Sequence, residues 1–201
     1  MNLLGKIIRL QIQRGSLKRD DAGRRVYDPA PLLAVDALTL TRTGACAHTA
    51  DGSFTLDVHN SAHPHTKFSG ANPLSFGFTS HYAVMRSRFG EHLTTGCAGE
   101  NILIETDVTV SLADVSSGVF IETPHGRIAL ESVIVARPCR PFSTYALAKT
   151  DPSTPELKAA LQFLDDGTRG FYCALASTSP ATVTLGDQVF SVGPSEAPSN
   201  G

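Results

Sequence analysis

The sequence predicts a mainly β fold, either a barrel or a sandwich. Many short segments alternate between apolar and polar residues with the period of a strand, whereas only two short segments have the period of a helix. The composition agrees, since 41% of the 201 residues are hydrophobic and 18% are charged, which indicates a compact chain with a large core. We therefore expect one domain over residues 1–192 and a disordered tail at residues 193–201.

The first expected element is a strand over residues 7–13, in which Ile8, Leu10 and Ile12 form one apolar face. Residues 14–25 follow. They are charged and contain two glycines, which predicts an exposed loop or the tip of a hairpin. The basic side chains in this segment suit contacts with phosphate, although the aspartates among them favour a solvated turn.

Most of the remaining chain has the pattern of short strands separated by turn residues. Residues 59–78 are an exception, because they are rich in His, Pro, Ser, Gly and Asn and predict a long loop of the kind that is often functional. Gly186 and Asp187 separate the last two strands and predict a hairpin turn. The expected strands cover residues 38–41, 54–58, 102–105, 108–112, 119–123, 127–136, 171–175, 182–185 and 188–192.

Two helices are expected. The first covers residues 80–89 and ends at Gly90. The second follows Ser153, which forms a capping box with Glu156, and its apolar stripe of leucine and alanine ends at Gly167. This second helix has the pattern of a structural element that packs on a core.

Charge and composition exclude several classes of function. The formal net charge is −2, from 17 Lys and Arg against 19 Asp and Glu, so the chain lacks the basic footprint of a nucleic-acid-binding protein. The N-terminus does not have the pattern of a signal peptide, and no apolar run is long enough to span a membrane. The four cysteines form no CxxC pair. We therefore expect a cytoplasmic protein with free thiols.

The segment ARPCRPF, residues 136–142, carries the strongest chemical signal. Two prolines stiffen the chain around Cys139, because each fixes its own φ and pushes the preceding residue toward extended geometry. Arg137 and Arg140 flank the thiol, and nearby positive charge favours a thiolate while guanidinium groups bind phosphate. A soft sulfur ligand beside an anion clamp suits a metal cofactor that carries a phosphate. The alternative is a buried cysteine in a stiff loop.

Two further segments place polar groups beside predicted strands. In CAGENI, residues 97–102, Glu100 and Asn101 form a polar pair at the mouth of a strand; the alternative is a turn in which the asparagine satisfies backbone groups. In DDGTRGFY, residues 165–172, Arg169 lies between glycines that allow it to enter a pocket; the alternative is a helix C-cap with an exposed arginine.

Taken in chain order, these segments resemble the MOSC domain, which is named for the C-terminal domain of molybdenum-cofactor sulfurase. The resemblance extends from about Ile7 to Val192 and includes residues 57–68 before the first helix. It depends on the ordered set, because no single piece is specific. The matching pieces are Gly99-Glu100-Asn101, Arg137-Pro138-Cys139, Arg169-Gly170-Phe171-Tyr172, and Leu185-Gly186-Asp187 with Val189.

The resemblance implies a closed β-barrel with peripheral helices, similar to the barrel domain of pyruvate kinase. It implies that Cys139 ligates molybdenum or carries sulfur, and that the molybdenum cofactor, a molybdopterin, is bound nearby. The positions that the resemblance assigns to cofactor binding are Arg137, Arg140, Arg169, Glu100 and Asn101.

The chain departs from the family pattern in two places. Residues 113–120 replace a Gly-Asp turn that is frequent in relatives, and the loop before the first helix has His59, His63 and His65 in place of a His-Gly-Gly pattern. The spacing of these histidines suits zinc only loosely, so polar loop histidines near the pocket are the favoured interpretation. Cys97 is a candidate resolving thiol, with a small packed residue as the alternative.

Three functions remain open at this stage. The first is a molybdenum-cofactor enzyme that reduces N-hydroxylated compounds with electrons from a partner protein, because the chain has no flavin or iron–sulfur motif. The second is a sulfur carrier that holds a persulfide on Cys139. A separate desulfurase would supply that sulfur, because we identify no lysine motif for pyridoxal phosphate. The third is a non-catalytic barrel that binds another ligand. Both of the first two need an exposed thiolate.

Overall fold

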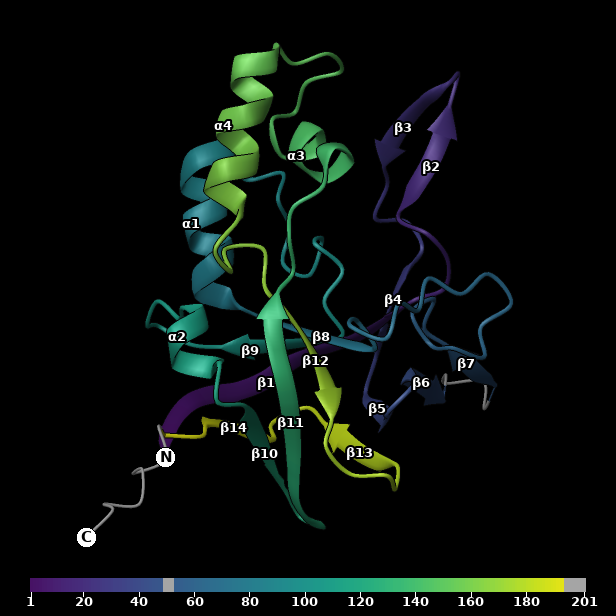
Figure 1. Cartoon of the computed structure of the whole chain (residues 1–201), viewed down its shortest axis with the longest axis vertical. Helices are drawn as coiled ribbons and strands as arrows, with labels where there is room; N and C mark the ends of the chain where they lie inside the picture. Colours follow the sequence, from purple (N-terminus) through teal and green to yellow (C-terminus); the bar gives the residue numbers. More distant parts are fainter. Residues whose placement is uncertain (49–52, 194–201) are drawn as a thin grey trace, which may run out of the picture.

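The computed structural model describes residues 1–48 and 53–193, and its centre is a closed barrel of seven strands (Figure 1). The strand order is β14-β10-β11-β12-β8-β9-β1, and β14 pairs back with β1 to close the ring. The barrel is mixed, because β8 and β9 are parallel while the other neighbours are antiparallel. These strands are β1 (Asn2–Gln13), β8 (Leu74–Phe78), β9 (Ile102–Glu105), β10 (Val119–Thr123), β11 (Gly126–Val135), β12 (Phe171–Leu175) and β14 (Gln188–Ser191).

The prediction of a mainly β closed barrel is confirmed. The strands expected at 102–105, 119–123 and 171–175 have the predicted bounds. Residues 74–78 lie inside the expected loop but form β8, which is buried along its whole length. A strand buried on both faces has no alternation to reveal it. The expected tail falls, apart from Gly193, on residues 194–201, which lie outside the described part of the chain.

Strand β1 changes face along its length. Its pairing with β9 shifts register between Ile7 and Arg9, which is a bulge-type irregularity. As a result Ile7 is only 1% exposed and Ile8 is half-buried, so the single apolar face expected for this strand is wrong at its start. Beyond the irregularity, Gln11 and Gln13 are buried as well as Leu10. The end of β1 therefore brings polar side chains beneath the site described below.

Two smaller sheets flank the barrel. Gly186 and Asp187 form a turn as expected, but the strands they connect belong to different sheets, so the predicted hairpin is wrong. Pairing partners far away in the sequence decide where each strand lies: β13 pairs with β5, and β14 pairs with β1 and β10. The remaining strands are β2 (Lys18–Asp21) with β3 (Arg24–Tyr27), β4 (Leu32–Val35) on the edge of β1, and the sheet of β13 (Ala181–Thr184), β5 (Ala37–Thr41), β6 (Gly44–His48) and β7 (Phe54–Leu56).

Four helices lie in the described residues: α1 (Thr79–Phe89), α2 (Leu112–Val115), α3 (Arg140–Ala146) and α4 (Thr154–Leu164). α1 and α4 match the two predicted helices, and the Ser153–Glu156 capping box is present. The strand expected at 108–112 is wrong, because Ser111 caps α2 through Asp114 and the backbone turns there. Figure 1 shows α1, α3 and α4 together beyond one end of the barrel.

The apolar interior has two parts. The first fills the barrel and includes Leu10, Phe76 and Phe171. The second lies between the barrel and the helices, and includes Tyr82 and Phe142. The site lies at the boundary of these two clusters. Within residues 1–48 and 53–193, no helix has the length and hydropathy that crossing a membrane requires.

Candidate functional site

Cys139 lies at the junction between β11 and α3. It is the N-cap residue of α3, with extended backbone angles of φ −113° and ψ 155°, and its carbonyl accepts the amide of Ser143 at 3.0 Å. The stiff loop expected through residue 142 is therefore shorter than predicted, because the helix already begins at Arg140. Pro141 is compatible with this start, since a proline in the first helical turn loses no hydrogen bond that the helix needs.

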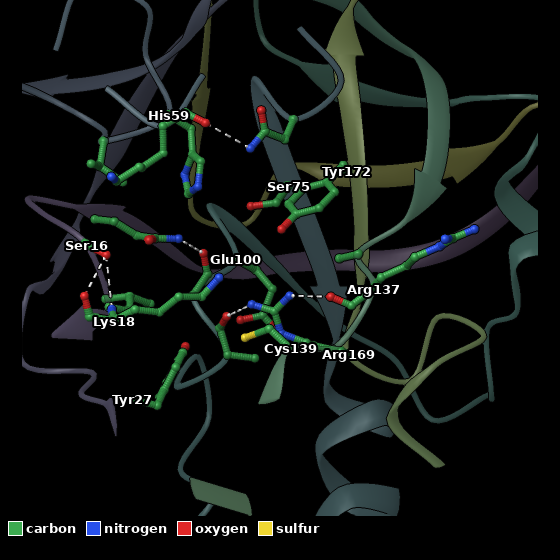
Figure 2. Close-up of a pocket in the computed structure, with 18 of the residues that line it drawn as sticks. Ser16, Lys18, Tyr27, His59, Ser75, Glu100, Arg137, Cys139, Arg169 and Tyr172 are labelled. Carbon is green, nitrogen blue, oxygen red and sulfur yellow. Dashed lines mark hydrogen bonds between the residues drawn. The ribbon is translucent and has the colours of Figure 1, made fainter. Parts of the chain in front are cut away.

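A cavity of about 270 Å³ opens beside the sulfur of Cys139, which is half-buried. We refer to it as the Cys139 cavity. Segments that are distant in the sequence converge on it, from the end of β1 to the start of β12 (Figure 2). The lining residues are Gln13, Ser16, Leu17, Lys18, Arg25, Tyr27, Val58, His59, Lys67, Asn72, Ser75, Ala98, Gly99, Glu100, Ala136, Arg137, Cys139, Arg169, Phe171 and Tyr172.

Arg169 is held rigidly in this cavity. Its guanidinium donates to the backbone carbonyls of Ala98 at 3.1 Å and Arg137 at 3.4 Å, and it lies 5.1 Å from the centre of the Phe142 ring. Figure 2 shows Cys139 and Arg169 side by side. The buried Nε of Arg169 has no hydrogen-bond partner among the described residues. A buried donor without a partner is costly, so an acceptor from a ligand would stabilise it.

Glu100 is buried within reach of the charge of Arg169. The hydroxyl of Tyr82 lies 2.8 Å from both carboxylate oxygens, and the same hydroxyl accepts the amide of Ala98 at 3.0 Å. Burial raises the pKa of Glu100, and the charge of Arg169 opposes that rise. The pKa of Arg169 is itself raised: burial acts against its charge, but the nearby Tyr172, Tyr27 and Cys139 outweigh that effect. The guanidinium therefore stays charged.

The turn that carries Glu100 is pressed against β1. Gly96 and Gly99 have φ values of 88° and 90°, which disfavour other residues. A Cβ on Gly99 would lie 2.7 Å from the side chain of Leu17 and 2.9 Å from that of Gln13. The side-chain amide of Gln13 donates from Nε2 to the carbonyl of Gly99 at 2.8 Å. Close backbone approach thus explains the glycines of the CAGENI segment.

Most of the charged residues that line the cavity are positive. Glu100 is the one carboxylate among the described residues that line it. Apart from Arg169, the cationic side chains are exposed at the rim, where Figure 2 shows Lys18 extending into the cavity. Such a lining favours an anionic ligand. The cationic lining residues are Lys18, Arg25, Lys67, Arg137 and Arg169.

His59 enters the cavity from the turn after β7. Its ring Nδ1 lies 3.1 Å from the carboxylate of Asp57, and its backbone amide donates to the same oxygen at 2.8 Å. Asp57 is fully buried, and its second oxygen accepts the amide of Gln13 at 2.7 Å and the side chain of Asn101 at 3.0 Å. The histidine is therefore fixed by a carboxylate that is itself anchored to the end of β1 and to Asn101, the residue before β9.

The structure brings together four of the six residues expected at the site: Cys139, Arg137, Arg169 and Glu100 all line the Cys139 cavity. Asn101 lies outside it. Its carbonyl oxygen accepts the amide and the hydroxyl of Ser75, each at 3.1 Å, so it satisfies neighbouring groups, as the alternative interpretation of CAGENI held. Arg140 also lies outside.

Arg140 lines a second groove of about 880 Å³, which we refer to as the Arg140 groove. The early start of α3 accompanies this placement: Arg140 is already helical, and it lines the groove rather than the Cys139 cavity. The Arg140 groove runs between the β2–β3 hairpin and α3, and shares Arg25 and Tyr27 with the Cys139 cavity.

His63 and His65 lie outside the Cys139 cavity, with ring centres 6.2 Å apart. Within the described residues, no group of three His, Cys, Asp or Glu side chains has the arrangement of a metal site. Cys97 is 2% exposed and does not line the cavity. Burial, assisted by the Glu100 carboxylate, raises its pKa to about 12. Its position favours the packed-residue interpretation over a resolving thiol.

Sequence reasoning missed several lining residues. Lys18 and Arg25 fall in the segment expected to be a solvated turn, which forms the β2–β3 hairpin beside the cavity. Tyr27 is buried at the end of β3, and its hydroxyl donates to the carbonyl of Cys97 at 2.8 Å. Lys67 comes from the long loop, whose length was the available signal.

Comparison with solved structures places this geometry in a known fold. YuaD from Bacillus subtilis aligns with a TM-score of 0.54 at 15% sequence identity, covering 94% of each chain. A second crystal structure, described as a hypothetical protein, aligns with a TM-score of 0.55 at 14% identity, covering 96% of this chain and 70% of the other. YuaD is a MOSC-domain protein. This chain has the MOSC fold.

The MOSC resemblance expected from the sequence is thus confirmed at the level of the fold. No protein-family model and no curated protein sequence matches the chain. At these identities a MOSC fold does not by itself carry a function, because one fold hosts many sites. The chemistry of this protein therefore depends on the residues of the Cys139 cavity.

Proposed function

We propose that this MOSC-fold protein binds the molybdenum cofactor in the Cys139 cavity and reduces N-hydroxylated compounds. One observation carries the proposal: a half-buried thiol and a rigid guanidinium line the same cationic cavity. Thiolates are ligands for soft metals, and arginines bind phosphate. The molybdenum cofactor combines these needs, because it presents a metal and a phosphate in one molecule.

The residues of the cavity fit that cofactor. Cys139 supplies the sulfur donor. Arg169 offers a buried Nε without a partner in the described chain, and Arg137 adds an exposed charge at the rim. Lys18 and Lys67 add to the cationic lining. The cofactor, when bound, supplies a metal that exchanges two electrons with the substrate.

The protein's own residues bind and orient the anionic part of the ligand. Arg169 cannot swing away, because two carbonyls and the Phe142 ring hold it, so it defines where a phosphate or other anion is placed. Glu100, hydrogen-bonded to Tyr82, places a carboxyl group within reach of the charge of Arg169. The electrons would come from a separate donor protein, which we propose as a partner.

Elemental mass spectrometry tests the proposal. We expect near-stoichiometric molybdenum in the wild type expressed in a host that makes the cofactor, and its loss in Cys139→Ser. Cys97→Ala is the matched control, because this thiol lies outside the cavity lining and should leave the metal content unchanged. Molybdenum retained by Cys139→Ser, or absent from all three proteins, would contradict the proposal.

The second candidate is a sulfur carrier. It is favoured by one observation: of the four cysteines, all of which lie in the described residues, Cys139 alone is not buried. A carrier must present its sulfur to a desulfurase partner and then to an acceptor. Mass spectrometry after incubation with a cysteine desulfurase would show one added sulfur atom on Cys139, and an unmodified thiol would exclude this function.

A further inference from the structure

His59 belongs to none of the roles assigned above, yet its geometry is that of a proton-transferring group. Asp57 is fully buried, and its two oxygens accept from three donors: the amides of Gln13 and His59 and the side chain of Asn101. The ring Nδ1 of His59 lies 3.1 Å from one of these oxygens. An ionised carboxylate only accepts hydrogen bonds. The proton on the His59 ring must therefore be on Nδ1.

This assignment leaves Nε2 of His59 available. The ring is 18% exposed, it lines the Cys139 cavity, and Figure 2 shows it pointing into that space. No hydrogen bond to Nε2 is present among the described residues. A neutral ring in this state accepts a proton at Nε2, and the resulting cation is stabilised by the carboxylate behind it.

The turn that carries Asp57 and His59 is held by backbone contacts on two sides. The amide of Val58 donates to the carbonyl of Gln13 at 2.8 Å, and the amide of Lys67 donates to the carbonyl of Val58 at 2.7 Å. On the other side, a Cβ on Gly44 would lie 2.4 Å from the Cα of Asn60, which shows how closely β6 supports the turn. His59 is thus held at a defined place relative to Cys139, as proton transfer requires.

We propose that His59 is the proton-transfer residue of the Cys139 cavity and that Asp57 is its positioning residue. The proposal rests on the proposed reductase function. Reduction of an amidoxime breaks the N–O bond, takes two electrons from the external donor protein and two protons, and releases the amidine and water. His59 takes one proton from solvent at Nε2 and passes it to the departing oxygen, and the second proton reaches the nitrogen from solvent.

Steady-state kinetics of His59→Gln test the catalytic role, with an aromatic amidoxime as substrate and reduced methyl viologen as electron donor. Glutamine keeps a polar group at the Nε2 position but cannot carry the proton. We expect kcat to fall about 100-fold or more, with KM changed less than about twofold and molybdenum content unchanged. The matched control is His65→Gln, in the same loop but outside the cavity, with wild-type kcat.

Three results would overturn the proposal: an unchanged kcat in His59→Gln, a raised KM with unchanged kcat, or loss of molybdenum. The first denies any role, the second assigns His59 to substrate binding, and the third assigns it to holding the cofactor.

An NMR experiment on the cofactor-free protein separates this inference from the proposed function. In ¹⁵N-labelled protein, the His59 signal, assigned by its loss in His59→Gln, should show a proton on Nδ1 and none on Nε2. Asp57→Asn should shift that signal toward the other tautomer. If the protein has no reductase activity but His59 carries its proton on Nδ1, the proposed reaction is wrong and the pairing of His59 with Asp57 stands. If His59 carries its proton on Nε2, the pairing is wrong, whatever the activity.

Discussion

Cys139 and Cys97 lie close to the same charged groups but have different environments. Both are near Tyr27, whose raised pKa reflects burial first and these two thiols among the smaller causes. Cys97 is packed into the second apolar cluster, 2% exposed, with its pKa raised to about 12. Cys139 lines the Cys139 cavity at the start of α3. The two thiols differ in their exposure to the cavity, which their distance along the chain from an arginine does not reveal.

The reason lies in the elements that carry them. Cys97 belongs to a turn whose glycines let it press against β1, so its side chain is enclosed. Cys139 caps a helix that starts at the cavity wall, and its side chain remains partly open. Sites that need a reactive group are often built at such ends of regular elements, because the backbone is fixed while the side chain stays accessible.

The largest expected effect is a difference in thiol reactivity. In cofactor-free protein, iodoacetamide should modify Cys139 at least about 100-fold faster than Cys97, because alkylation needs an exposed thiolate. Peptide mass spectrometry over time measures both rates. Cys139→Ser should abolish the fast phase of modification. Equal rates for the two cysteines would contradict the difference in exposure between them.

A smaller effect is expected for the two arginines of the cavity. Arg169→Ala should cost about 2–3 kcal/mol of folding stability, because it removes two hydrogen bonds to backbone carbonyls and the contact with Phe142. Arg137→Ala should cost less than about 0.5 kcal/mol, because its side chain is exposed. Urea unfolding measures both, and similar losses would show that Arg169 is not the rigid member of the pair.

The smallest expected effect concerns Glu100 and pH. Burial raises its pKa above the ordinary 4.5, so Glu100 contributes stability at low pH that is lost as pH rises through the folded-state pKa. Glu100→Gln keeps an acceptor for Tyr82 without the charge. The stability of the wild type relative to this variant should therefore decrease as the pH rises above the ordinary pKa of 4.5, as measured by urea midpoints. A relative stability that rises with pH would contradict a raised pKa for Glu100.

The mainly β fold class followed from short alternating segments, and the Arg-Pro-Cys and Arg-Gly-Phe-Tyr pieces contain the thiol and two of the cationic residues that line the cavity. The failures have physical causes. β8 is buried on both faces and shows no alternation. α3 begins at Arg140 although Pro141 follows, which is contrary to the usual preference for extended geometry before a proline. That start moves Arg140 into the Arg140 groove.

His59 shows the limit most clearly. Three histidines in one loop were equivalent as residue types, and only one lines the cavity. Asp57 distinguishes it, because a fully buried carboxylate anchored by Gln13 and Asn101 orients the His59 ring. The anchoring residues are distant in the sequence, and their partners become visible only when β1, β9 and the loop are packed together.

The residue pattern by itself determined a mainly β fold and the chemical type of its most promising group, a thiol flanked by arginines. Local pattern suffices for these, because periodicity and residue type act over a few neighbouring positions. The tertiary structure decided which arginine faces the thiol, which histidine enters the cavity, and which cysteine is open to it. Those choices depend on strand register and on the residue at which a helix starts, and contacts between residues far apart in the chain set both.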